Sequence, residues 1–146
     1  MAALYLLAQR SPQRGIAFVG GRRREDILGE QEFRALGWEV RITTEDGSLG
    51  EKGLVTRALA AELGQCKRGR KLFACGPTRM LKAVGQLAAE YNLPAELSLD
   101  EHMGCGVGVC LTCVVPIKSG GGWEYQRTCT EGPVFDSCQI AWGAGE

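Results

Sequence analysis

Four cysteines in the last third of the chain have the spacing of an iron-sulfur ligand set. Cys105, Cys110 and Cys113 form the pattern C-x4-C-x2-C, and Cys129 follows after fifteen intervening residues. This is the plant-type spacing for a [2Fe-2S] cluster, in which four thiolates hold two irons. The sequence therefore predicts a [2Fe-2S] site at these four cysteines.

Glycines alternate with other residues in the first part of this motif. Gly104, Gly106 and Gly108 surround Cys105. A loop that wraps closely round a cluster must turn its N–H groups inward, and a Cβ atom would often clash there or forbid the required positive φ. We therefore expect these glycines to shape the loop.

Three other uses of the cysteines fit the sequence less well than a [2Fe-2S] cluster does. A four-cysteine zinc site usually has two C-x2-C pairs, and this chain has one such pair among the four. A Rieske centre needs two histidines, and His102 is the only histidine. A disulfide framework fits poorly with seven cysteines and no signal-peptide pattern. We expect a reducing compartment, the cytoplasm.

Length and charge narrow the class of protein. The chain has 146 residues, 45% of them hydrophobic, which suffices for one ordinary core with a small additional module. Lys and Arg number 17, as do Asp and Glu, so net charge does not favour nucleic acid or an anionic membrane as a partner. No apolar run approaches the length of a membrane span.

The first hundred residues alternate between helical and strand patterns. Four helices are expected. The first begins at residue 1, and the second carries Ile27 to Leu36 and ends at Gly37. The third covers 54–63, and the fourth follows Pro77 as far as Tyr91. Expected strands cover 15–21, 38–43, 72–75 and 95–99. This alternation predicts βαβ units and a parallel sheet with right-handed crossovers.

Glycine or polar residues follow each expected strand, at 20–22, 44–46, 76–77 and 100–101. Ligands of parallel sheets bind beyond the carboxyl ends of the strands. The cysteine loop leaves the same edge of the sheet.

A hairpin is expected after the third cysteine. Residues 114–117 and 123–128 have strand patterns on either side of a turn at 119–122. The hairpin would return Cys129 to the cysteine loop. Phe135, Ile140 and Trp142 are the expected packing groups of the tail.

Three ordered motifs are similar to one family. LDEHMGCGVGVCLTCVVPIK with QRTCTEGPVF resembles the C-terminal end of the electron-transfer subunit of the two-subunit, NAD-dependent dihydroorotate dehydrogenase. TTEDGSLGEKGLVT and FACGPTRMLKAV resemble the nucleotide-binding half of its ferredoxin-reductase-type module. The resemblance implies an α/β nucleotide-binding domain at 1–98 and a [2Fe-2S] domain with a β-hairpin at 99–146.

The resemblance also implies an electron path. NADH would reduce FAD, and electrons would pass through the [2Fe-2S] cluster to FMN in a catalytic subunit that oxidises dihydroorotate in pyrimidine synthesis, within a heterotetramer. By motif, the segments that would line the nicotinamide nucleotide contain Thr44, Asp46, Gly76 and Pro77. The segment near its adenosine end contains Gly21 and Arg22.

The sequence departs from the family at its start. Family members have an N-terminal β-barrel that holds most of the FAD, and a first strand before the helix that here begins the chain. The missing strand would lie between strands 15–21 and 72–75. The expectation is therefore a fragment or a wrongly assigned start, with a complete cluster motif.

Two other functions remain as alternatives. One is the reductase subunit of another flavin and iron-sulfur complex, such as a hydrogenase, a sulfite reductase or a ferredoxin:NADP oxidoreductase. The small subunit of the ferredoxin:NADP oxidoreductase has an aspartate where this chain has Cys105. The other alternative is a zinc-stabilised binding module.

Several further residues have two interpretations. Cys75 is either a thiol near the nicotinamide or a small residue ending a strand, and Cys66 and Cys138 have no matching role. Arg23, Arg24 and Glu45 fit either a nucleotide site or a solvated turn. Glu101 and His102 lie beside the cluster motif, where His102 could influence the potential without binding iron.

Overall fold

The computed structural model describes residues 2–65 and 69–144. The chain forms two compact units, one over residues 1–67 and one over 68–146. Each unit has its own three-stranded sheet. Cys66 lies outside the described residues. No helix within the described ranges is long and apolar enough to cross a membrane.

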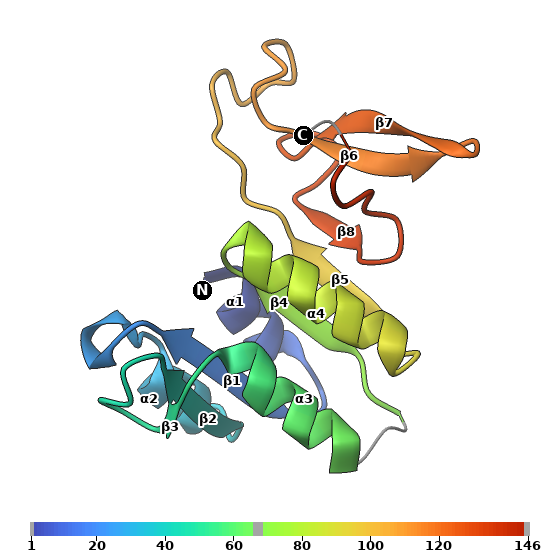
Figure 1. Cartoon of the computed structure of the whole chain (residues 1–146). Helices are drawn as coiled ribbons and strands as arrows, with labels where there is room; N and C mark the ends of the chain where they lie inside the picture. The colour runs from blue at the N-terminus through green and yellow to red at the C-terminus, as the bar shows by residue number, and fades with distance from the viewer. Residues whose placement is uncertain (1, 66–68, 145–146) are drawn as a thin grey trace. The chain divides into compact units, whose positions relative to one another are not determined.

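The first unit is built on a parallel sheet, as predicted. Strands β1 (Ile16–Gly21), β2 (Glu39–Thr44) and β3 (Glu51–Lys52) lie in the order β1-β2-β3 (Figure 1). β1 and β2 pair over their full length, so that Gly21 lies opposite Thr44 at their carboxyl ends. The register therefore brings two predicted site residues to the same edge.

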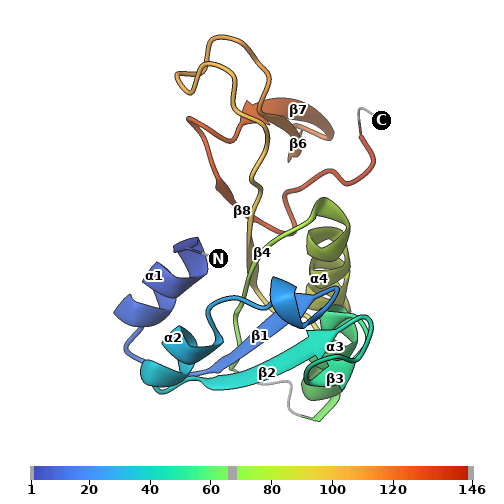
Figure 2. The same cartoon turned by 90° about the vertical axis from the view of Figure 1, so that its left-hand side faces the viewer.

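Helices cover both faces of this sheet (Figure 2). Helices α1 (Ala2–Arg10) and α2 (Glu30–Ala35) lie on one face, and α3 (Val55–Gln65) lies on the other. The core on the first face is made of buried Ala8, Val19, Phe33 and Val40. Ala17 and Val19 of β1 and Val40 and Ile42 of β2 belong to this core or pack against it, because alternate side chains of a strand point to the same face of the sheet.

The prediction of one helix that carries Ile27 to Leu36 is wrong about where the helix begins. A short 3-10 turn, η1 (Arg24–Asp26), comes first, and α2 begins only at Glu30. Gly29 between them has φ +78, and Ile27 is extended. A left-handed glycine cannot continue a right-handed helix, so the apolar residues at 27 and 28 precede the helix.

The second unit contains a mixed sheet. Strands β4 (Leu72–Cys75), β5 (Ala95–Ser98) and β8 (Val134–Asp136) lie in the order β4-β5-β8. β4 and β5 are parallel, as predicted, and helix α4 (Thr78–Glu90) connects them. β8 is antiparallel to β5 and was not predicted as a strand. Phe135 of β8 is buried opposite Leu97 of β5, so the tail extends this sheet.

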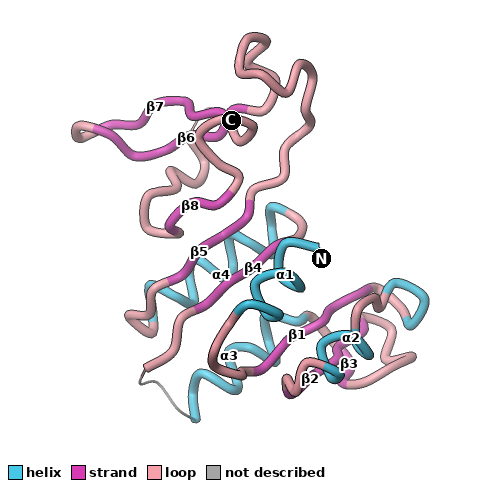
Figure 3. The backbone as a smooth tube through the Cα atoms, turned by 180° about the vertical axis from the view of Figure 1, so that it is seen from behind, coloured by secondary structure: helices cyan, strands magenta, loops and turns pink. Residues whose placement is uncertain are grey.

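The predicted hairpin is confirmed. Strands β6 (Val114–Ser119) and β7 (Gly122–Arg127) form an antiparallel pair. The tail packs against this unit as expected, because Ile140 is buried and bridges to Ile117. The chain between β5 and β6, which contains three of the four motif cysteines, is loop (Figure 3).

Candidate metal centre

Cys105 and Cys110 form the first of two cysteine pairs in the second unit. The backbone N–H of Cys105 donates to Sγ of Cys110 at 3.4 Å, and the N–H of Cys110 donates to Sγ of Cys105 at 3.4 Å. The N–H groups of Val107 and Val109 also donate to Sγ of Cys105, at 3.4 and 3.3 Å. The loop therefore turns its N–H groups toward sulfur.

This arrangement stabilises a thiolate. The N–H groups of Cys110, Val107 and Val109 lower the pKa of Cys105 to about 6, because each hydrogen bond favours the charged sulfur. Thiolates rather than thiols bind iron. The backbone of the loop thus favours the form of Cys105 that can bind a metal.

Cys113 and Cys129 form the second pair. Cys113 is buried at the start of the hairpin, and the N–H of Thr128 donates to its carbonyl oxygen at 2.9 Å. The N–H and the thiol of Cys129 lower the pKa of Cys113 by donating to its sulfur, and the same thiol contact raises the pKa of Cys129. The predicted role of the hairpin is met, because it returns Cys129 to Cys113.

The two pairs suit a metal centre with two ions. In a [2Fe-2S] cluster four thiolates are shared between two irons, whereas a structural zinc site places four ligands round one ion. None of the described cysteines forms a disulfide, and within the described ranges no three or more His, Cys, Asp or Glu side chains are gathered so that they could hold a metal ion. The four predicted ligands therefore come together as two pairs, Cys105 with Cys110 and Cys113 with Cys129.

The three glycines of the loop have the geometry that the sequence predicts. Gly106 and Gly108 have φ values of +68 and +82, a backbone region that favours glycine. A Cβ atom on Gly104 would lie 3.0 Å from Sγ of Cys110. The small residues therefore allow the turn and the close approach to sulfur.

Sequence reasoning missed several residues around the cysteines. The hydroxyl of Thr112 donates to Sγ of Cys110 at 3.1 Å. Arg127 donates to the carbonyl oxygen of Gly108 at 3.2 Å and forms an ion pair with Glu131. Their positions in the sequence could have indicated them, because Arg127 lies two residues before Cys129 and Glu131 lies two residues after it.

His102 is exposed, and so are the apolar side chains of the cysteine loop. Met103, Val107, Val109 and Leu111 each expose 60% or more of their surface. A group of exposed apolar side chains is typical of a contact surface.

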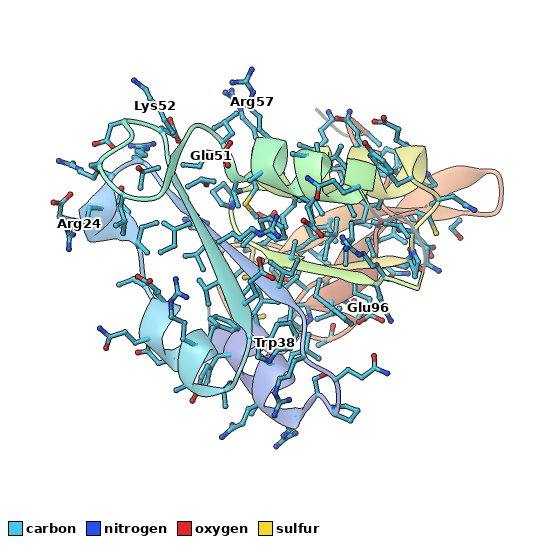
Figure 4. All side chains as sticks on the ribbon, turned by 90° about the horizontal axis from the view of Figure 1, so that it is seen from below. Arg24, Trp38, Glu51, Lys52, Arg57 and Glu96 are labelled. Atoms are coloured by element: carbon cyan, nitrogen blue, oxygen red, sulfur yellow. The ribbon has the colours of Figure 1, made fainter. Side chains whose placement is uncertain are left out.

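A second set of predicted residues meets at the carboxyl ends of β1 and β2. The N–H of Glu45 donates to the carbonyl oxygen of Gly21, and the N–H of Asp46 donates to that of Arg22, both at 3.1 Å. Gly21, Arg22, Thr44 and Asp46 are therefore neighbours. Arg24 of η1, Lys52 of β3 and Arg57 of α3 project outward at this end of the unit (Figure 4).

The polar side chains here also hold their own loop. The hydroxyl of Thr44 donates to the carbonyl oxygen of Leu49 at 2.8 Å and accepts from its N–H at 3.0 Å. Asp46 accepts from the hydroxyl and the N–H of Ser48, at 2.6 and 2.9 Å, and these bonds lower its pKa. The turn interpretation of Asp46 thus has direct support.

Gly76 and Pro77 follow β4 in the second unit. Gly76 has φ +157, and a Cβ atom on it would lie 2.7 Å from Cε of Met80. Pro77 precedes α4, and its carbonyl oxygen accepts from the N–H of Leu81 at 3.0 Å. The two residues lie at the N-terminus of a helix, where backbone N–H groups can face an anion.

Comparisons with known proteins agree with this site. Residues 100–141 match the family model of the iron-sulfur cluster binding domain of dihydroorotate dehydrogenase B. This range contains both cysteine pairs. The molecule thus belongs to the class of α/β proteins with an iron-sulfur cluster binding domain.

The particular family follows from the curated relatives. The chain is 41% identical over 125 residues to the electron transfer subunit of dihydroorotate dehydrogenase B (NAD(+)) from Desulforamulus reducens, and 42% identical over 136 residues to that from Shouchella clausii. These matches cover 86% and 90% of the chain, and 47% and 50% of the relatives. The chain belongs to this family and spans about half the length of the relatives it matches.

A solved structure shows the same fold. It is that of the NADH-dependent reduced ferredoxin-NADP oxidoreductase of flavin-based electron bifurcation, with a TM-score of 0.78 and 28% identity. The match covers 97% of this chain and 50% of the other. The expected similarity to a ferredoxin-reductase-type structure is therefore confirmed at the level of the fold.

Proposed function

We propose that this chain carries electrons from NADH, through FAD and a [2Fe-2S] cluster, to the FMN-containing catalytic subunit of dihydroorotate dehydrogenase in pyrimidine biosynthesis. The observation that carries the proposal is the division of four cysteines into two pairs inside a segment that matches the cluster-binding family. A bound cluster supplies one-electron transfer.

The residues of the chain have separate tasks at the cluster. Cys105, Cys110, Cys113 and Cys129 are the proposed ligands. The N–H groups of Val107 and Val109 face sulfur, and hydrogen bonds to cluster sulfur favour the more negative, reduced state. The loop thereby holds the thiolates and stabilises their charge.

The proposed nucleotide contacts lie at strand ends. Gly21, Arg22, Thr44 and Asp46 are neighbours at one sheet edge, and Gly76 with Pro77 lies at the start of α4. Backbone groups at these places support binding of NAD(H) and FAD, since ligands of parallel sheets bind beyond the carboxyl ends of strands. Cys75 remains a candidate thiol at this position.

The proposed functional division is a nucleotide-binding part at 1–98 and a cluster part at 99–146. The cysteine loop and the hairpin that returns Cys129 both lie in the second range.

The proposed partner is the FMN-containing catalytic subunit, within a heterotetramer in the cytoplasm. Electrons can leave the cluster only if the partner approaches the cysteine loop closely. Val107, Val109 and Leu111 are exposed apolar side chains on that loop and support a protein contact there. Charge balance supports neither nucleic acid nor an anionic membrane as a partner.

Anaerobic reconstitution tests the cluster. The chain is incubated with iron and sulfide, and its metals, acid-labile sulfide and visible absorption are measured. We expect two irons and two sulfides per chain. A colourless protein that takes up zinc instead would contradict electron transfer and support the zinc-stabilised binding module.

The second candidate is the reductase subunit of another flavin and iron-sulfur complex, which the fold shared with the ferredoxin-NADP oxidoreductase favours. Co-purification separates the two. We expect the complete subunit that contains this chain to bind an FMN-containing dihydroorotate dehydrogenase. Binding to a hydrogenase or sulfite reductase subunit instead would support the second candidate.

A further inference from the structure

Arg127, the last residue of β7, connects two parts of the cysteine site. Its Nη1 donates to the carbonyl oxygen of Gly108 at 3.2 Å. Its Nε donates to Oε2 of Glu131 at 2.9 Å, and its Nη2 bonds Oε1 of the same carboxylate. The guanidinium group therefore holds a carboxylate with two donors and a loop carbonyl with a third.

Glu131 fixes the position of this guanidinium group. Its carboxylate also accepts from the backbone N–H of Arg127 at 2.7 Å. The N–H groups of Glu131 and Gly132 donate to the carbonyl oxygen of Arg127, at 2.9 and 3.2 Å. Cys129 lies inside the tight turn that these bonds close, so the ion pair and the ligand-bearing turn form one unit.

Gly108 is where the cysteine loop meets this turn. Its carbonyl oxygen accepts from Arg127, while its N–H donates to the sulfur of Cys129. The neighbouring N–H groups of Val107 and Val109 donate to Sγ of Cys105. A shift of Gly108 would therefore disturb both cysteine pairs.

We propose that Arg127 and Glu131 are positioning residues that clamp the loop of Cys105 and Cys110 onto the turn of Cys129, and that their opposite charges adjust the midpoint potential of the cluster. The inference rests on the proposed [2Fe-2S] site. Neither side chain is a ligand; Arg127 acts through Gly108, and Glu131 acts through Arg127.

The two charges predict opposite effects on one-electron reduction. The reduced cluster carries one more negative charge than the oxidised cluster, so a nearby cation favours reduction and a nearby anion opposes it. Arg127 lies two residues before Cys129 and donates to the carbonyl oxygen of Gly108 in the cysteine loop, and Glu131 lies two residues after Cys129, so both charges lie beside the proposed cluster. Removing Arg127 should lower the midpoint potential, and removing the charge of Glu131 should raise it.

Four variants of the full chain test the proposal after anaerobic reconstitution. Arg127→Gln and Glu131→Gln each break the clamp. Arg127→Lys keeps the charge, but an ammonium group lacks the planar fork that reaches three acceptors. Arg34→Gln is the matched control, because Arg34 forms an i,i+4 ion pair with Glu30 at 3.1 Å in the other unit. Circular dichroism shows which variants fold.

Two quantities are measured: the rate of cluster loss to a chelator, from visible absorption, and the midpoint potential, from the electron paramagnetic resonance signal. Arg127→Gln and Glu131→Gln should lose the cluster about 10-fold faster, as is typical when a residue that orients a ligand is removed. Their potentials should move in opposite directions. Arg127→Lys should lose the cluster faster at an unchanged potential, and Arg34→Gln should match the wild type.

Unchanged loss rates and potentials in Arg127→Gln and Glu131→Gln would overturn the proposal, and so would potentials that move in the same direction. If both variants fail to fold, Arg127→Lys decides through its loss rate. A wild-type chain that takes up no iron would instead refute the proposed function. The clamp is then tested in the metal-free chain, where Arg127→Gln should speed amide hydrogen exchange at residues 107–110 and unchanged exchange would refute it.

Discussion

A Cβ atom on Gly108 would lie 3.0 Å from Cγ2 of Thr130, the residue directly after Cys129. Gly106, two residues earlier in the same loop, also has a positive φ, but a Cβ atom there would have no neighbour within 4 Å. The two glycines therefore share the backbone requirement and differ in packing. The close approach of Gly108 joins the cysteine loop to the turn of the fourth cysteine.

Gly108→Ala should consequently weaken the site more than Gly106→Ala. Both changes place an alanine at positive φ, which costs about 1–2 kcal/mol. Only Gly108→Ala also pushes the loop away from Thr130. We expect cluster loss to a chelator to be roughly 10-fold faster in Gly108→Ala than in Gly106→Ala. Equal rates in the two variants would show that the packing of Gly108 is unimportant.

Cys129→Ser should prevent stable assembly of the cluster, whereas Cys138→Ser should not. Cys129 faces Cys113, while the N–H of Cys138 donates to Asp136 at 3.0 Å in the tail. Both changes replace a thiol by a hydroxyl in the same unit. The iron and sulfide bound per chain are measured. Loss of iron in Cys138→Ser would show that the assignment of Cys129 as the fourth ligand is wrong.

Gly50→Ala should strongly destabilise the first unit. Gly50 has φ +67, and a Cβ atom on it would clash with the carbonyl oxygen of Ile42 in β2. Strain and overpacking together should lower the free energy of unfolding by about 2–5 kcal/mol. Gly69→Ala is the control, since Gly69 has φ +70 and no neighbour within 4 Å of a Cβ atom. Denaturant titration of both variants compares them, and equal losses would contradict the close contact.

Arg41→Met should destabilise the first unit more than Arg34→Met. Arg41 donates to Glu62 at 2.6 Å, and Glu62 is 6% exposed on α3. Loss of a hydrogen bond to a buried charge costs about 1–3 kcal/mol. The side chain of Arg34 is 54% exposed, so its ion pair contributes about 0–1 kcal/mol. Thermal or denaturant unfolding should reveal this order, and a reversed order would contradict it.

Asp46 should have a pKa below 3.8, because the hydroxyl and the N–H of Ser48 bond its carboxylate. Its contribution to folding is fully present above about pH 4 and is lost as the pH falls through the lower folded-state pKa. Ser48→Ala should raise this pKa toward 3.8. A carboxyl-carbon NMR titration measures it, and Ser11→Ala is the control, since the Ser11 hydroxyl bonds Gln13 instead. An unchanged value in Ser48→Ala would contradict the assignment.

Local patterns in the sequence were sufficient for most of the helices and strands. A short apolar run closed by glycines predicted β1, and apolar segments followed by glycine or polar residues predicted β2, β4 and β5, because burial and turn geometry depend on neighbouring residues. The same patterns failed at Gly29, whose left-handed conformation separates η1 from α2. They also missed β8, a short strand formed by pairing with the distant β5.

The ligand chemistry could be predicted from the order of residues, since four thiols at this spacing are typical of an iron-sulfur site wherever the loop lies. The arrangement of those thiols depends on the folded chain. The hairpin carries Cys129 to Cys113, and Arg127 reaches the carbonyl oxygen of Gly108 across nineteen positions. No local pattern encodes such contacts, because they depend on how β6 and β7 pair and where the cysteine loop then packs.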